Sequence, residues 1–183
     1  MDHEVGGETR VSARIRQVDP IAEPVLGGAR WDYADTFEVV LDHPDDHAAD
    51  QWLRTALDHA GEPVRRLIRL VHRAVVRFDL DRNDPDTFLG WHQLVSEHDV
   101  AAVEADGSLL RAVLVTRRHS PTRCTGSTYL FFHKPTAARL MWLFVRPVHL
   151  RVERQLLAGA ARALTDNRLD VPARDVSSGV IDR

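Results

Sequence analysis

The sequence predicts a single α+β domain in which an antiparallel β-sheet packs against a long C-terminal helix. The first observation is that the hydrophobic period changes from helical to strand-like after about residue 90. The second is that the strand-like segments follow one another with very short links, which makes neighbouring strands antiparallel. The third is a helical apolar pattern from about Lys134 to Leu164. Four strands are expected before that helix, at 91–97, 100–105, 109–118 and 125–133.

The links between these strands include Asp106-Gly107, which is the strongest hairpin signal in the chain. The first half of the chain supplies one more strand and two helices. Trp31–Leu41 is rich in aromatic and β-branched residues and alternates, which favours a strand. Helices are expected at 47–60 and from Pro63 to about Phe78. Arginines gather on one arc of the second helix and aliphatic residues on the other, so one face should pack on the domain.

The length of 183 residues fits one domain. We expect residues 1–28 to form an irregular lead-in, residues 29–164 to form the folded domain and residues 165–183 to form a flexible tail. The net charge of −3 gives no electrostatic basis for binding nucleic acid. The N-terminus lacks the apolar segment of a signal peptide, and no apolar run approaches the ~20 residues of a membrane span. We therefore expect a cytoplasmic protein without a nucleic-acid or membrane partner.

The long C-terminal helix contains Pro147, which predicts a kink near Phe144–Pro147. Proline removes a backbone donor and clashes with the preceding turn, so it frees carbonyl groups there. His149 follows two residues later. An unperturbed imidazole titrates near pH ~6.5, so His149 can serve as a general base in a cavity. It can also simply hydrogen-bond a freed backbone group, and the sequence leaves both interpretations open.

Two segments carry a resemblance to a known family. They are Trp31-Asp32-Tyr33-Ala34-Asp35-Thr36-Phe37 and Leu143-Phe144-Val145-Arg146-Pro147-Val148-His149. The second segment resembles the aromatic–x–x–Pro–x–His stretch in the last helix of the bacterial DUF2867 family, and the similarity covers roughly residues 30–160. The resemblance implies a helix-grip body of the START or Bet v 1-like (SRPBCC) type. Some related proteins enclose an apolar cavity between sheet and helix, several bind hydrophobic molecules, and some are polyketide cyclases or dehydratases.

DUF2867 proteins have no well-established catalytic residues, so this resemblance assigns no roles to matching positions. The hypothesis is that the chain binds a small, largely apolar molecule in a cavity under its C-terminal helix. If it is an enzyme, we expect cofactor-independent acid–base chemistry of the cyclase, dehydratase or lyase kind. A cavity of this type needs few polar groups to orient a ligand. The candidate catalytic residues are His149, Arg146, Tyr129 and His92.

The candidate ligand-binding residues are Leu110, Leu114, Phe131, Phe144 and Val148, with ordinary core packing as the alternative. No metal site is expected, because the ten histidines show no dense ligand spacing. A second hypothesis is a non-catalytic homodimer or accessory protein that uses the aromatic strand at 129–132 as its contact. A weaker third hypothesis is peripheral membrane association through the basic helix at 63–78.

Overall fold

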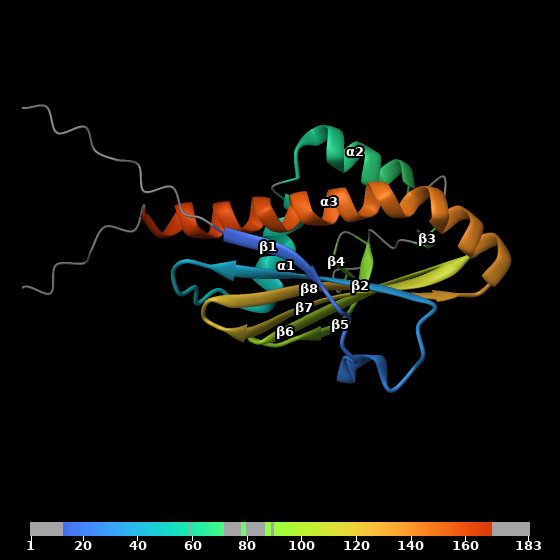
Figure 1. The fold of residues 1–183 in the computed structure, drawn as a ribbon, viewed down its shortest axis with the longest axis horizontal. Helices are drawn as coiled ribbons and strands as arrows, with labels where there is room; N and C mark the ends of the chain where they lie inside the picture. Colours follow the sequence, from blue (N-terminus) through green and yellow to red (C-terminus); the bar gives the residue numbers. More distant parts are fainter. Residues whose placement is uncertain (1–12, 59, 72–77, 80–86, 89, 170–183) are drawn as a thin grey trace, which may run out of the picture.

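The computed structural model describes residues 13–58, 60–71, 78–79, 87–88 and 90–169. Its strands are β1 (Ala13–Val18), β2 (Tyr33–Leu41), β3 (Phe78–Asp79), β4 (Thr87–Phe88), β5 (Trp91–Ser96), β6 (Val100–Gly107), β7 (Leu110–Ser120) and β8 (Arg123–Phe132). Its α-helices are α1 (Ala49–Asp58), α2 (Glu62–Leu70) and α3 (Pro135–Leu169). The strands form one antiparallel sheet in the order β1-β2-β8-β7-β6-β5-β4, with β3 paired to β6 (Figure 1). The predicted fold class, a helix-grip-like α+β arrangement, is confirmed.

The N-terminal lead-in is not irregular throughout, because Ala13–Val18 forms β1 and pairs antiparallel with β2. Ala13 and Ile15 alternate with Arg14 and Arg16, and the two apolar side chains pack against the core beneath α3. This alternation is typical of an edge strand that is covered on one face. The expectation for residues 1–28 was therefore wrong at 13–18, and residues 1–12 lie outside the described part.

Three element boundaries also differ from the prediction. The β6–β7 turn follows Gly107, and Asp106 lies inside β6 opposite Arg111, so the Asp106-Gly107 signal pointed about two residues too early. Phe78 belongs to β3 rather than to the end of the second helix, which as α2 is described to Leu70. α3 continues to Leu169, past the predicted end at Leu164. The proposed tail beyond residue 169 lies outside the described residues.

The sheet is covered on both faces. One face carries α1, α2 and α3, and two core clusters lie between these helices and the strands. The opposite face carries the segment between β1 and β2, whose short helix η1 (Pro24–Leu26) places Leu26 against Val113, Val115 and Tyr129. Side chains alternate across a strand, so Leu130 packs on the helix side while Tyr129 packs on the η1 side. This division decides which predicted residues can reach a site beneath α3.

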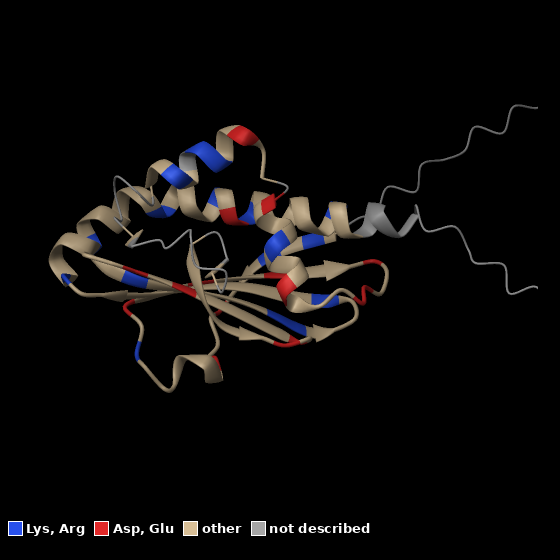
Figure 2. Ribbon diagram, turned by 180° about the vertical axis from the view of Figure 1, so that it is seen from behind, with Lys and Arg blue, Asp and Glu red and all other residues tan. Residues whose placement is uncertain are grey.

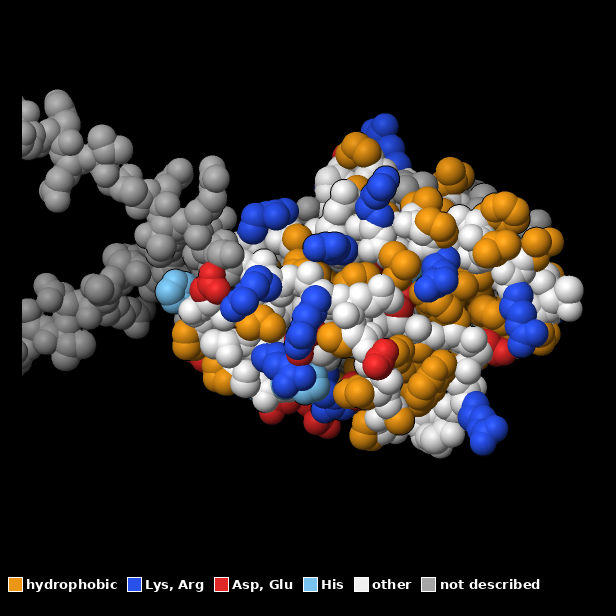
Figure 3. All heavy atoms as spheres, viewed as in Figure 1, with side chains coloured by type: hydrophobic (Ala, Val, Ile, Leu, Met, Phe, Trp, Pro, Cys, Tyr) orange, Lys and Arg blue, Asp and Glu red, His pale blue; other side chains and the backbone are white. Residues whose placement is uncertain are grey.

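α3 runs unbroken through Pro147, and Figure 1 shows it curving over its first turns before it crosses the sheet. Among the described residues no helix is both long and apolar enough to cross a bilayer. The outer face of the first half of α3 nevertheless exposes large apolar side chains. Leu140, Leu143 and Phe144 are 61%, 68% and 73% exposed. Figure 3 shows hydrophobic side chains gathered over this part of the helix.

Candidate active site

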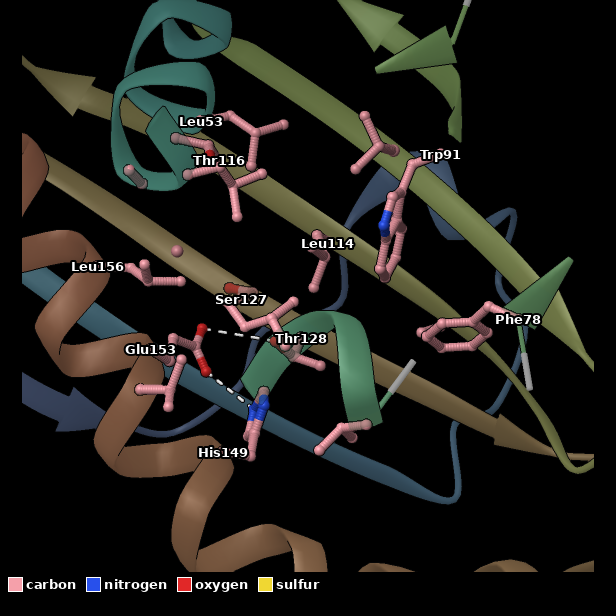
Figure 4. A pocket seen from close by; sticks show the side chains of 18 of the residues that line it. Leu53, Phe78, Trp91, Leu114, Thr116, Ser127, Thr128, His149, Glu153 and Leu156 are labelled. Atoms are coloured by element: carbon pink, nitrogen blue, oxygen red, sulfur yellow. Dashed lines mark hydrogen bonds and ion pairs between the residues drawn. The ribbon is translucent and has the colours of Figure 1, made fainter. Parts of the chain in front are cut away.

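A cavity of about 820 Å³ lies between the sheet and the three helices. Its walls are largely aliphatic and aromatic. They include Leu53, Phe78, Trp91, Leu114, Leu156 and Trp142, and five of these are labelled in Figure 4. This volume falls within the ~300–1,000 Å³ that small-molecule sites span. The space is therefore large enough for a ligand of drug-like size.

Two clusters of ionisable side chains line this cavity. One consists of Glu62, Arg65 and Arg69 on α2, and the other joins α3 to the sheet. His149 Nε2 lies 3.1 Å from Asp35 Oδ2 and 3.0 Å from Glu153 Oε2. Thr128 on β8 donates a long hydrogen bond of 3.5 Å from Oγ1 to Glu153 Oε1. Figure 4 shows Glu153 projecting from α3 toward Thr128 and His149. We refer to Asp35, His149 and Glu153 as the triad.

Local structure explains why the triad converges. His149 and Glu153 are four residues apart on α3, and positions i and i+4 lie on the same face of a helix. Asp35 is near the start of β2, where it shares the helix-side face with Tyr33 and Phe37. β2 pairs with β8 inside the sheet, so Asp35 is 1% exposed. The helix thus supplies two members of the triad and the sheet supplies the third.

The protonation state of the triad follows from burial and from the mutual contacts. Burial alone would lower the pKa of His149, but its contacts with Asp35 and Glu153 outweigh burial and raise that pKa to about 10. Burial raises the pKa of Glu153 to about 8, although the contact with His149 opposes this shift. Burial would raise the pKa of Asp35 too, but the hydrogen bond from His149 and other contacts lower it. Near neutral pH the triad therefore holds an aspartate, an imidazolium and a protonated glutamic acid.

Polar atoms around the triad are not all satisfied. Asp35 Oδ2 accepts a hydrogen bond of 2.5 Å from the Tyr33 hydroxyl, but Asp35 Oδ1 is buried without a hydrogen-bond partner among the described residues. Glu153 Oε2 is likewise buried without a hydrogen bond, despite its ion-pair distance to His149. Trp142, which lines the cavity 5.0 Å from the His149 ring, has a buried Nε1 without an acceptor among them. Buried groups of this kind cost free energy unless something pairs with them.

The structure brings only part of the predicted site together. His149, Leu110, Leu114 and Val148 line the cavity, as the hypothesis requires. Arg146 lies outside the cavity lining, with its guanidinium 5.6 Å from the centre of the Tyr33 ring.

The other predicted residues lie elsewhere. Tyr129 and Phe131 pack on the opposite face of the sheet, where the Tyr129 hydroxyl donates to the Ile21 carbonyl at 2.6 Å. His92 is exposed and absent from the cavity lining, because its neighbour Trp91 takes the inward-facing position. Phe144 points outward and is 73% exposed. β8 is an interior strand with Tyr129 and Leu130 buried, so these two side chains cannot form a dimer contact.

Sequence reasoning missed Asp35, Glu153 and Trp142. One signal was available for Glu153, because an acid four residues after a candidate histidine shares its helix face. Asp35 lies inside the first segment that carries the family resemblance. A carboxylate inside a largely apolar strand is a second signal, since buried acids are rare without a partner. Nothing in the sequence indicated that Asp35 meets α3, because that contact joins residues more than one hundred positions apart.

The triad is also the one group of potential metal ligands that the described residues form. Its three ligand atoms, one imidazole nitrogen and two carboxylate oxygens, lie within 4.8 Å of one another. Histidine and carboxylate donors suit several divalent cations. The Tyr33 hydroxyl and the His149 imidazole already bond to Asp35 Oδ2. The expectation that no metal is bound thus stays a prediction, and a metal-binding measurement on this group tests it directly.

Comparison with known proteins adds no assignment. No protein-family model matches the chain, and no curated protein and no solved structure matches it either. The case for function therefore depends on the geometry of the cavity and the triad.

Proposed function

We propose that the protein binds a small, largely apolar molecule with one oxygen acceptor, and that the triad performs acid–base chemistry on it. The observation that carries this proposal is the meeting of the triad with a largely apolar cavity of about 820 Å³. Apolar walls favour an apolar ligand through the area that they remove from water. A few convergent polar groups then fix its orientation.

Two residues that line the cavity carry buried polar atoms without a hydrogen-bond partner among the described residues, and a ligand oxygen that reaches these atoms would pair with them. Trp142 Nε1 can only donate, and Glu153 donates in its protonated form. A carbonyl, ether or hydroxyl oxygen accepts from both kinds of group, whereas a plain hydrocarbon leaves them without a partner. We therefore favour ketone-like or hydroxylated apolar molecules over hydrocarbons.

Glu153 is the acid in this scheme. Its proton passes to the ligand oxygen, and the carboxylate that remains is stabilised by the His149 imidazolium 3.0 Å away. The Glu153 carboxylate then takes a proton from the carbon next to the reacting one. A protonated carbonyl thereby becomes its enol, and a protonated hydroxyl departs as water while a C=C bond forms. Asp35 holds His149 in its charged form and in place through the 3.1 Å contact. This chemistry fits the cofactor-independent cyclase or dehydratase type implied by the family resemblance.

A matched pair of ligands tests the binding part of the proposal. We would compare 2-acetylnaphthalene with 2-isopropylnaphthalene, which have similar shape and differ in the carbonyl oxygen. Both should raise the melting temperature, because each binds only the folded state. The ketone should bind roughly fivefold more tightly, since one net hydrogen bond is worth about 1 kcal/mol. If neither compound shifts the melting temperature, the cavity is not a site for apolar ligands of this size.

Two variants test which side chain contacts the ligand oxygen. Trp142→Phe keeps an aromatic ring but removes the unsatisfied Nε1 donor, so it should abolish the preference for the ketone. Trp91→Phe removes an indole from the same cavity and should weaken both ligands alike. If Trp142→Phe still prefers the ketone, the carbonyl oxygen of the ligand contacts a group other than Trp142 Nε1.

A further inference from the structure

The outer face of α3 combines exposed apolar side chains with arginines, and of these residues Val148 alone also lines the cavity. Leu140, Leu143 and Phe144 are more than 60% exposed, and Val148 is 42% exposed. We call these four residues the apolar patch. Monomeric proteins seldom leave several large apolar side chains exposed side by side, and such a group marks an interaction surface.

The exposed charges that α3 itself carries beside the apolar patch have one sign, although Arg139 lies 3.7 Å from the Asp32 carboxylate. α3 carries Arg139, Arg146, Arg151, Arg154 and Arg162 within its described side chains. All five are exposed. The sole acidic residue in the same stretch is Glu153, and it turns inward to the triad. Figure 2 marks these basic positions in blue along the helix, and Figure 3 shows blue side chains beside the hydrophobic ones. A chain with a net charge of −3 thus presents one strongly basic helix face.

We propose that this face of α3 docks on the surface of an anionic phospholipid bilayer. Apolar side chains on one helix face enter the boundary between headgroups and acyl chains, while arginines contact the lipid phosphates. The long arginine side chains can extend their charges outward as the apolar patch sinks between them. The charge argument favours an anionic membrane over a second copy of this chain, because two copies would bring ten arginines together. This proposal revises the expectation of no membrane partner and places the contact on α3 rather than on α2.

The arginines of α2 make the weaker membrane surface for a specific reason. Arg65, Arg66 and Arg69 all lie within 3.6 Å of the Glu62 carboxylate, which offsets part of their charge. Arg151 and Arg154 on α3 make no ion pair with any side chain in the described part of the chain. The position of the apolar patch also connects it to the cavity, since Val148 is exposed and lines the cavity as well.

Co-sedimentation with vesicles tests the docking surface. The full chain would be mixed with vesicles of phosphatidylcholine alone or with about one third phosphatidylglycerol. We expect binding to the anionic vesicles, falling steeply with salt. Replacing Arg151 or Arg154 by Gln should weaken binding roughly fivefold for each arginine. The double variant Leu143→Ser/Phe144→Ser should weaken it about tenfold or more, because both side chains would otherwise leave water.

Ile21→Ser is the matched control, because Ile21 is 47% exposed but lies in the segment that covers the opposite face of the sheet. It should bind vesicles like the unaltered protein. No binding to anionic vesicles, or binding that Leu143→Ser/Phe144→Ser leaves intact, would overturn the proposal. Light scattering tests the alternative that the apolar patch is a contact between two copies of the chain. A dimer that dissociates in the same double variant would support that alternative and overturn the membrane proposal. The surface variants leave the cavity unaltered, so this test and the ligand test fail independently.

Discussion

Each face of the sheet holds one of the chain's two tyrosines, and the two hydroxyls bond to different kinds of partner. On the η1 side, the Tyr129 hydroxyl donates to the Ile21 carbonyl and its ring meets Trp31 edge-on at 5.3 Å. On the helix side, the Tyr33 hydroxyl donates to Asp35 inside a cluster that retains unsatisfied atoms. A hydroxyl that bonds to a loop carbonyl fixes the loop and stabilises the fold. A hydroxyl that bonds to a buried carboxylate instead affects the charge and position of that carboxylate in the site. Residue type does not decide between these roles, but the face of the sheet does.

The largest effect that sharpens this contrast should come from Tyr129→Ala. Tyr129 is fully buried, and deleting a buried aromatic ring costs about 3–5 kcal/mol of unfolding free energy. Urea unfolding measures this loss. Under conditions where the variant is folded, its affinity for 2-acetylnaphthalene should match that of the unaltered protein, because Tyr129 does not line the cavity. Loss of ligand affinity in the folded variant would return Tyr129 to the candidate site.

The contrast also shows what the sequence could predict. Periodicity located β5 to β8 within about two residues, because each strand has a buried face. It could not assign Tyr129 to a face relative to α3, since β8 is covered on both sides and both sets of its side chains are apolar or small. His149 was found because Pro147 and the family resemblance both mark that turn. Asp35 was missed because its partner is set by packing between β2 and α3.

Asp35→Asn should give the next largest effect, on the other face. The change removes the negative charge that stabilises the His149 imidazolium while burial of the imidazole remains. Breaking a buried ion pair from one side costs about 3 kcal/mol or more, and an isosteric amide should lie at the low end. The pKa of His149 should fall well below 10, and an NMR titration of the imidazole carbons measures it. If the pKa of His149 stays near 10 in this variant, the contact with Glu153 is enough to keep the imidazole protonated.

The pH dependence of stability tests the proton on Glu153. Folding raises the pKa of Glu153 from 4.5 to about 8 and that of His149 from 6.5 to about 10. The folded state therefore holds both protons more tightly than the unfolded chain does. Stability from Glu153 is lost as the pH rises from about 4.5 to 8, and stability from His149 is lost from about 6.5 to 10.

Glu153→Gln removes the first of these two contributions. Unfolding free energies measured in urea between pH 5 and 8 should fall with pH in the unaltered protein and stay nearly flat below pH 6.5 in the variant. Any residual slope above that value belongs to His149. Equal slopes in both proteins would mean that Glu153 is ionised in the folded state, and Glu153 could not then be the acid of the proposed reaction.

The smallest effect should follow Arg146→Gln. This variant compares the residues of α3 that line the cavity with the exposed arginines of the same helix. Arg146 was a catalytic candidate, but it is exposed and absent from the cavity lining, and its guanidinium lies 5.6 Å from the centre of the Tyr33 ring. An exposed cation–π contact contributes about 0.5–1 kcal/mol, so the loss of stability should not exceed that. Affinity for the naphthalene ligands should stay unchanged, because Arg146 does not line the cavity. Binding to anionic vesicles should weaken like that of the other α3 arginine variants. A variant that loses ligand affinity but keeps vesicle binding would show that Arg146 acts through Tyr33 on the triad instead.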